Sequence, residues 1–142
     1  MPLYVVQGAY DAAQHRDVLA ELHWPILHEQ FGDRPFRYLQ DNAPTHKGRA
    51  VTEWQDENPQ FSQSVVCLPR YSPDLNPIEH VWARLKKKIA RQRLMTRDAL
   101  TQAILRAWDE IGRDEAFLTA LCTSMPTRMR SVIVEEGGAT RY

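Results

Sequence analysis

Two short polar segments of this 142-residue sequence carry side chains that could bind a metal ion. The first runs Gln40-Asp-Asn-Ala-Pro-Thr-His46, and the second runs Ser72-Pro-Asp-Leu-Asn-Pro-Ile-Glu-His-Val-Trp82. Carboxylates such as Asp41 and Glu79, which have 37 residues between them, are the oxygen ligands that Mg²⁺ takes in proteins. Two divalent ions about 3.5–4 Å apart can activate an attacking oxygen and stabilise a leaving oxygen. The residue types are therefore compatible with metal-dependent phosphodiester chemistry.

Each of these residues also has a purely structural interpretation. Glu79 stands three residues after Asn76, which is the spacing of a helix capping box. Asp41 precedes Asn-Ala-Pro, so its side chain could instead close an Asx-turn at the end of a strand. The sequence leaves both alternatives open. Weaker candidates for orienting a metal or substrate are Asn42, His46 and His80, because single histidines are more often surface or core residues than ligands.

The elements around the first segment alternate between strands and helices. Strands are predicted at Leu3–Gln7, at Phe36–Asp41, and at the wholly apolar run Ser64–Leu68, which is typical of a parallel sheet. Apolar periodicity predicts one helix between Asp11 and Phe31 and another over about Pro44–Asn58. Asp41 is therefore expected at the carboxyl end of a strand.

The second segment opens a helical half. Asn76 and Pro77 have the residue types of a helix start, and a further helix is predicted to begin near Thr96. A shorter helix is expected around Phe117, and Pro126 is expected to separate it from a last helical piece. The tryptophans Trp24, Trp82 and Trp108 are assigned to the core and not to base stacking, and the cysteines Cys67 and Cys122 are expected to be buried free thiols.

Charge is distributed unevenly although the net charge is zero. Residues 1–83 carry six Lys or Arg against eleven Asp or Glu, whereas residues 84–142 carry twelve against seven, so the halves carry about −5 and +5. The pattern predicts one helix over residues 84–97 that contacts a polyanion such as DNA, with a solvated helix face as the alternative. The basic residues are Arg84, Lys86, Lys87, Lys88, Arg91, Arg93 and Arg97.

Composition excludes several other classes of protein. Hydrophobic and charged contents of 43% and 25% are ordinary globular values, and the sequence shows no repeat. No apolar run is long enough for a membrane span, and no secretory signal is readable. We therefore expect a soluble, intracellular protein without a membrane partner.

The two polar segments, in this order, resemble the Tc/mariner transposases and related bacterial insertion-sequence transposases. The resemblance covers essentially the whole chain, including Leu3–Gly8 and the ending from Ser124 to Tyr142. It implies an RNase H-like α/β fold with an incomplete sheet and a helical C-terminal half. The α/β core would occupy about residues 1–93, and a C-terminal helical extension about residues 94–142.

The same resemblance implies a site and an activity. Asp41 and Glu79 would be the second and third catalytic, metal-binding acids of a DDE endonuclease and strand transferase that uses Mg²⁺ or Mn²⁺. The expected partners are DNA at transposon ends and, in addition, another copy or a full-length transposase. The location would be the nucleus in a eukaryote, as the C-terminal resemblance suggests, and otherwise the cytoplasm.

One part of the family pattern has no counterpart in this sequence. In the family the first catalytic Asp lies on a strand upstream of the one resembling Leu3–Gln7, and a helix-turn-helix lies further upstream. Asp11 falls at a helix cap and matches no catalytic position. We therefore expect an N-terminally truncated domain that is inactive by itself. A non-catalytic remnant that binds DNA or a transposase, or a truncated reading frame without a role, are the alternatives.

Overall fold

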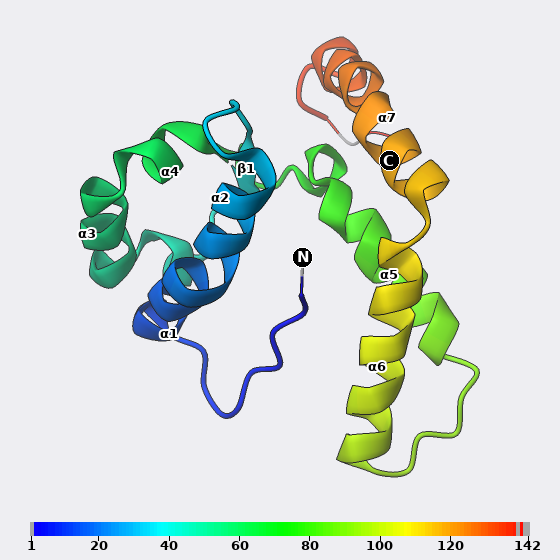
Figure 1. The fold of residues 1–142 in the computed structure, drawn as a ribbon. Coiled ribbons are helices and arrows are strands. Elements are labelled where there is room, and N and C mark those ends of the chain that lie inside the picture. Colours follow the sequence, from blue (N-terminus) through cyan, green and yellow to red (C-terminus); the bar gives the residue numbers. More distant parts are fainter. Residues whose placement is uncertain (1, 139, 141–142) are drawn as a thin grey trace. The chain divides into compact units, whose positions relative to one another are not determined.

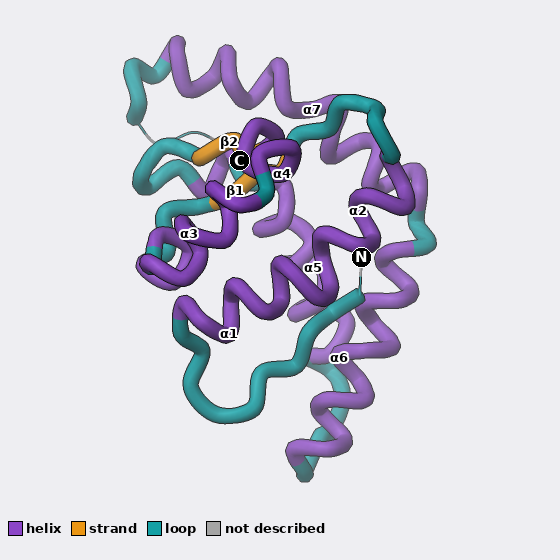
Figure 2. The backbone as a smooth tube through the Cα atoms, turned by 60° about the vertical axis from the view of Figure 1, so that its left-hand side comes forward, coloured by secondary structure: helices purple, strands orange, loops and turns teal. Residues whose placement is uncertain are grey.

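The computed structural model describes residues 2–138 and 140, which divide into two compact units, Met1–Tyr71 and Ser72–Tyr142. Each unit has an apolar cluster of its own. Figure 2 shows that both strands belong to the first unit, while the described part of the second unit is built from helices and loops. The boundary expected near residue 93, between the α/β core and the helical extension of the family fold, is a different division and stays a prediction.

The first regular element of the first unit is one uninterrupted helical run, which follows the N-terminal loop (Figure 1, α1 and α2). It comprises α1 (Ala12–Asp17), the π-helical turn η1 (Val18–His23) and α2 (Trp24–Phe31). Asp11 caps this run, as expected, and forms a capping box with Gln14, because the Gln14 amide donates to the Asp11 carboxylate and the Asp11 amide donates to the Gln14 side chain. Gly32 ends the run at a φ of 54°, a conformation that favours glycine.

Two further helices close the core of the first unit. The 3-10 turn η2 (Pro44–Lys47) leads into α3 (Arg49–Glu57), and α4 (Pro59–Ser64) follows. The helix expected over Pro44–Asn58 is therefore divided, because Gly48 adopts an extended conformation between η2 and α3. Four fully or nearly fully buried side chains form the centre of the cluster, and Trp24 packs against them as predicted: Leu19, Leu27, Val51 and Phe61.

Strands β1 (Tyr38–Gln40) and β2 (Val65–Cys67) form a two-stranded parallel sheet, with Tyr38 opposite Val65. The parallel pairing confirms the sequence prediction. The strand expected at Leu3–Gln7 is wrong, because no strand of the described chain pairs with this segment and an unpaired strand has no ladder to stabilise it.

Burial of the sheet also differs from the prediction. Leu39 and Val66 face each other in the register and are 40% and 38% exposed, and the Cys67 thiol is exposed as well. The apolar sequence of β2 indicates a strand buried on both faces, but Val66 and Cys67, which point to opposite faces of the strand, are both exposed. The expectation that Cys67 and Cys122 are buried is therefore wrong, because the thiol of Cys122 is also exposed.

The second unit begins with the 3-10 turn η3 (Pro73–Leu75) and continues with α5 (Pro77–Ile89), α6 (Arg97–Gly112) and α7 (Glu115–Val134). Its buried cluster takes residues from all three long helices, namely Val81, Leu85, Ala107, Ile111 and Leu121. The rings of Trp82 and Trp108 stack at 5.2 Å against this cluster, which confirms that both belong to the core. No helix in residues 2–138 is long and apolar enough to cross a membrane.

Two helix boundaries in this unit correct the sequence prediction. A single helix over residues 84–97 is wrong, because α5 ends at Ile89 and the Thr96 hydroxyl caps a new helix by accepting from the Ala99 amide. Pro126 does not divide α7, which runs through it. A proline removes one intrahelical hydrogen bond, and this 20-residue helix continues despite that loss.

Candidate active site

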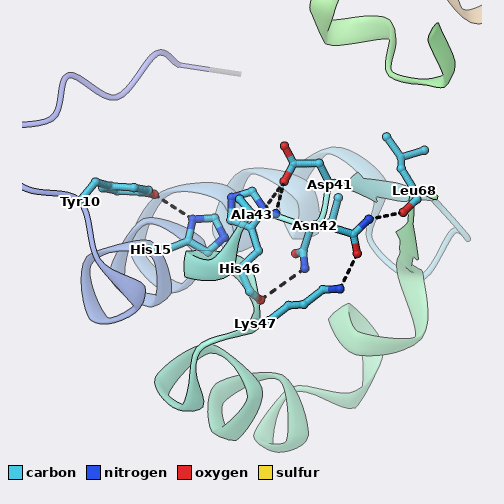
Figure 3. A network of polar contacts seen from close by, with 9 residues as sticks. Tyr10, His15, Asp41, Asn42, Ala43, His46, Lys47 and Leu68 are labelled. Atoms are coloured by element: carbon cyan, nitrogen blue, oxygen red, sulfur yellow. Dashed lines mark hydrogen bonds and ion pairs between the residues drawn. The ribbon is translucent and has the colours of Figure 1, made fainter. Parts of the chain in front are cut away.

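Asp41 follows directly on β1, so its carboxylate lies at the carboxyl end of the sheet (Figure 3). One oxygen, Oδ1, accepts a 2.9 Å hydrogen bond from the Ala43 amide, which closes the Asx-turn considered above. The side chain remains 52% exposed, and no hydrogen bond occupies Oδ2 among the described residues. The turn therefore fixes the carboxylate and leaves one oxygen open, so the structural and metal-binding interpretations are compatible.

His46 lies against the same oxygen of Asp41. Its Nδ1 is 2.8 Å from Asp41 Oδ1, an ion-pair distance, but the N–H direction is not aligned for a hydrogen bond and Nδ1 has no other described partner. The imidazole ring is stacked on that of His15, with centroids 4.2 Å apart and planes inclined by 27°. The structure thus places His46 beside Asp41.

Asn42 holds the ends of the two strands together. Its Nδ2 donates a 2.6 Å hydrogen bond to the Leu68 carbonyl, just beyond β2, and its Oδ1 accepts from the Lys47 ammonium (Figure 3). The Leu68 amide in turn donates to the Gln40 carbonyl. Asn42 is therefore engaged in positioning the backbone that carries Asp41. Lys47 is a neighbour that the sequence analysis did not identify.

His15 is the second residue near Asp41 that the sequence analysis missed. It is 6% exposed, and the Tyr10 hydroxyl lies 2.8 Å from its Nδ1. Burial is the main reason why the pKa of His15 is lowered to about 4, with the neighbouring His46 as the next cause. Its position four residues before Leu19, on the buried face of the helical run, was the signal available in the sequence.

Glu79 lies in the first turn of α5, after Asn76 at the cap and Pro77 at the first helical position. The capping-box alternative is not realised, because the Asn76 side chain makes no cap hydrogen bond and the Glu79 side chain makes none within the described chain. The carboxylate is exposed and faces solvent at a helix N-terminus. It is therefore free to bind a cation.

His80 and Arg128 lie near this helix start. The pKa of His80 is lowered by burial and by the positive charge of Arg128, and the charge of Glu79 opposes this shift. Arg128 on α7 is only 2% exposed, and it donates to the Ser124 hydroxyl and to the Asp74 carbonyl in η3. It thus ties α7 to the turn that precedes Glu79, a contact that no local pattern predicts.

The basic residues after Glu79 fall into two groups. Arg84 pairs with Asp114 at 2.6 Å and lies 4.2 Å from the centroid of the Phe117 ring, while Lys88 pairs with Glu110 at 2.6 Å. Arg84 and Lys88, which the sequence analysis assigned to the polyanion contact, are therefore each paired with an acid of the same unit, Asp114 at the cap of α7 and Glu110 on α6. Lys88 is exposed despite its ion pair, and the other exposed basic residues of this region include Lys86, Lys87, Arg91 and Arg93.

Within residues 2–138 and 140, no group of three or more His, Cys, Asp and Glu side chains could hold a metal ion. Asp41 lies in the first unit and Glu79 lies in the second unit. Carboxylate oxygen is nevertheless the hard donor that suits Mg²⁺ and Mn²⁺.

Comparison with known proteins shows the family to which the chain belongs. The family model of the DDE superfamily endonuclease matches residues 1–101. The chain is 33% identical to the Tc1 transposase of Caenorhabditis elegans and 31% identical to the Tcb1 transposase of Caenorhabditis briggsae; each alignment covers 99% of this chain and 50% of the relative. The chain spans about half the length of the curated relatives it matches.

Solved structures show the same fold. The catalytic domain of the Mos1 mariner transposase matches with a TM-score of 0.79 at 22% identity, over 94% of this chain and 66% of that one. The Mos1 transposase catalytic domain with raltegravir and Mg matches with a TM-score of 0.76 at 23% identity, over 94% and 67%. This likeness confirms the predicted RNase H-like fold. The chain belongs to the DDE superfamily endonucleases and is a portion of a Tc1/mariner-family transposase catalytic domain.

Proposed function

We propose that this chain supplies Asp41 and Glu79 as metal-binding acids of a transposase that cleaves and joins DNA phosphodiesters. The observation that carries the proposal is that the two motif acids of a DDE family member both keep carboxylate oxygens without a hydrogen-bond partner in the described chain. Asp41 is engaged on one side only, and Glu79 is not engaged.

The ion that fits these donors is Mg²⁺ or Mn²⁺. Both residues offer hard anionic oxygen, and the Mos1 catalytic domain has been solved with Mg and with Mn. When bound, such ions make the attacking oxygen nucleophilic and stabilise the leaving oxygen. In the chain itself, the Ala43 amide fixes the direction of the Asp41 carboxylate, and the N-terminus of α5 favours anionic groups near Glu79.

DNA is the substrate class that the charge distribution favours. Exposed Lys86, Lys87, Arg91 and Arg93 follow Glu79 with no acidic residue before Asp98. Such residues bind phosphates through release of counterions, independently of base sequence. A second function, binding of DNA or of a full-length transposase without cleavage, is favoured by the same exposed cations. The relatives from Caenorhabditis favour the nucleus as the location.

We further propose that the 142 residues do not cleave DNA by themselves. They carry two of the three acids that the family resemblance implies, and the described residues contain no third ligand that groups with either acid. A two-metal reaction requires the attacking and leaving oxygens to be held in line, and about 1 Å of misplacement can cost around a hundredfold in rate.

The test is a nicking assay on transposon-end DNA with Mn²⁺. The chain is incubated alone and with an upstream fragment that carries the first acidic strand of the family. We expect nicking only with the fragment present, and its loss in Asp41→Asn and Glu79→Gln. Matched controls are Asp56→Asn, an exposed acid on α3, and Glu115→Gln, an acid in the first turn of α7.

Three outcomes separate the possibilities. Nicking by the chain alone that either motif substitution abolishes would show that two acids suffice, which refutes the proposed inactivity. Nicking that persists in both motif variants would refute the assignment of the two acids. Duplex binding without nicking under any condition would support the second function.

A further inference from the structure

A chain of contacts leads from the segment before α1 to Asp41. The Tyr10 hydroxyl lies 2.8 Å from His15 Nδ1, the His15 ring stacks on the His46 ring at 4.2 Å, and His46 Nδ1 lies 2.8 Å from Asp41 Oδ1. Figure 3 shows these side chains following one another toward the carboxylate. All four belong to the first unit, so the chain of contacts lies within one compact body.

The stack depends on a close approach between two backbone segments. A Cβ on Gly48 would lie 2.2 Å from the Cβ of Ala12, so the absence of a side chain at residue 48 lets η2 pack closely on α1. His46 stands two residues before Gly48, and His15 stands three residues after Ala12. The glycine therefore allows the two imidazole rings to meet face to face.

Burial makes His15 suited to hold a neighbouring ring. Its low pKa keeps it uncharged at neutral pH, so its buried ring brings no charge to the stack on His46. Its Nε2 is buried without a described partner, and only Nδ1 has one, the Tyr10 hydroxyl. An apolar residue would fill this position without leaving a buried ring nitrogen without a hydrogen-bond partner. Filling space therefore does not by itself account for a histidine here.

We propose that His15 is a positioning residue that holds the His46 ring against Asp41 Oδ1, so that Oδ2 of the carboxylate stays open and would be available to a divalent cation. The metal-binding part of this inference rests on the proposed function. The steric part does not, because the orientation of Asp41 is a property of the protein without metal. Tyr10 fixes the direction of the His15 ring.

The experiment uses the 142-residue chain and three substitutions that remove different parts of the chain of contacts. His15→Ala removes the ring, His15→Phe keeps a stacking ring of similar size but loses both nitrogens, and Tyr10→Phe removes only the hydroxyl. His28→Ala, at an exposed histidine on α2, is the matched control. The readouts are the NMR signals of the Asp41 side-chain carboxyl carbon and the Ala43 amide, and the affinity for Mn²⁺ measured by electron paramagnetic resonance.

We expect His15→Ala to shift both NMR signals and to weaken Mn²⁺ binding severalfold. That loss should be smaller than the roughly 10–100-fold that removal of a direct outer-shell partner costs. His15→Phe should restore most of the signals and affinity because it restores the stack, and Tyr10→Phe should have an intermediate effect. His28→Ala should change neither readout.

Two results separate failure of this inference from failure of the proposed function. If His15→Ala lowers thermal stability but leaves the Asp41 and Ala43 signals in place, His15 is a structural residue only and the inference is overturned. If Asp41→Asn leaves Mn²⁺ binding unchanged, the proposed function fails, while a shift of the two NMR signals in His15→Ala that His15→Phe reverses still supports positioning. If His15→Phe is as defective as His15→Ala, stacking is not the cause and the inference is also overturned.

Discussion

Substitution of Gly48 by alanine tests the packing on which the arrangement around Asp41 depends. Gly48 has φ −68° and ψ 152°, which alanine adopts without strain, so the added methyl group acts only through its contacts. It would lie 2.2 Å from the Ala12 Cβ, well inside van der Waals contact, so η2 and α1 must move apart.

The size of the effect follows from two opposing contributions. Forcing extra volume into a packed site costs about 1–3 kcal/mol. Replacing glycine by alanine lowers the entropy of the unfolded chain, which offsets about 0.4–1 kcal/mol of that cost. We therefore expect Gly48→Ala to lower the local free energy of unfolding by about 1–2 kcal/mol, a factor of roughly 5–30 in the equilibrium between closed and open states.

Amide hydrogen exchange measures this change at the right place. The amides of Val51 and Thr52 donate to the Gly48 carbonyl, so their protection reports directly on this turn. The amide of Leu85 in the second unit serves as the internal control.

A compensating substitution makes the test sharper. In the double variant Ala12→Gly/Gly48→Ala, the new methyl group would meet the Ala12 Cα at 3.7 Å, an ordinary contact. Ala12→Gly by itself should cost no more than about 1 kcal/mol of helix propensity. The double variant should therefore recover most of the protection that Gly48→Ala loses. Equal protection in Gly48→Ala and the parent, or strictly additive losses in the double variant, would refute the packing argument.

The remaining predictions concern pH, an ion pair and DNA. The folded-state pKa of His15 lies below its ordinary value of 6.5, so the unfolded chain binds the extra proton between about pH 6.5 and 4. The contribution of His15 to the free energy of unfolding should be fully present above pH 6.5 and fall by roughly 2–4 kcal/mol as the pH drops through this window. Urea titrations at several pH values should show a weaker pH dependence of the free energy of unfolding in His15→Phe and the same dependence as the parent in His28→Phe. Arg84→Gln should lower the thermal transition of the second unit more than Lys87→Gln, because Arg84 contacts Asp114 and Phe117 whereas Lys87 is exposed; equal effects would contradict this division. Replacing the exposed cations by Gln should weaken binding to all duplexes and reduce the salt slope by up to about 0.9 for each phosphate that the protein no longer neutralises, with Arg106→Gln as the control; these cations are Lys86, Lys87, Arg91 and Arg93.

Local signals in the sequence predicted the elements that hold the two acids. The helix cap at Asp11, the strand that leads into Asp41, and the start of α5 at Pro77 each depend on residues within a few positions of one another. The predicted strand at Leu3–Gln7 failed because strand formation requires a partner, and apolar alternation within the segment carries no information about one.

The contacts around the candidate site were not predictable in the same way. The stack of His15 on His46 joins residues 31 positions apart and depends on the missing side chain of Gly48. Arg84 was assigned to a polyanion contact from its charge, yet it packs on Phe117 thirty-three positions later. Such side chains have an amphipathic character, and tertiary packing decides which way they turn.

Residue-resolved broadening of NMR signals by Mn²⁺ is the most direct test of the assignment of Asp41 and Glu79. Paramagnetic broadening falls steeply with distance, so substoichiometric Mn²⁺ affects the amides nearest the ligands first. We predict early loss of the signals of residues 41–43 and 78–80, and loss of each effect in Asp41→Asn or Glu79→Gln respectively. Broadening that begins instead at other exposed acids, such as Glu135 and Glu136, with the motif residues unaffected, would contradict the assignment.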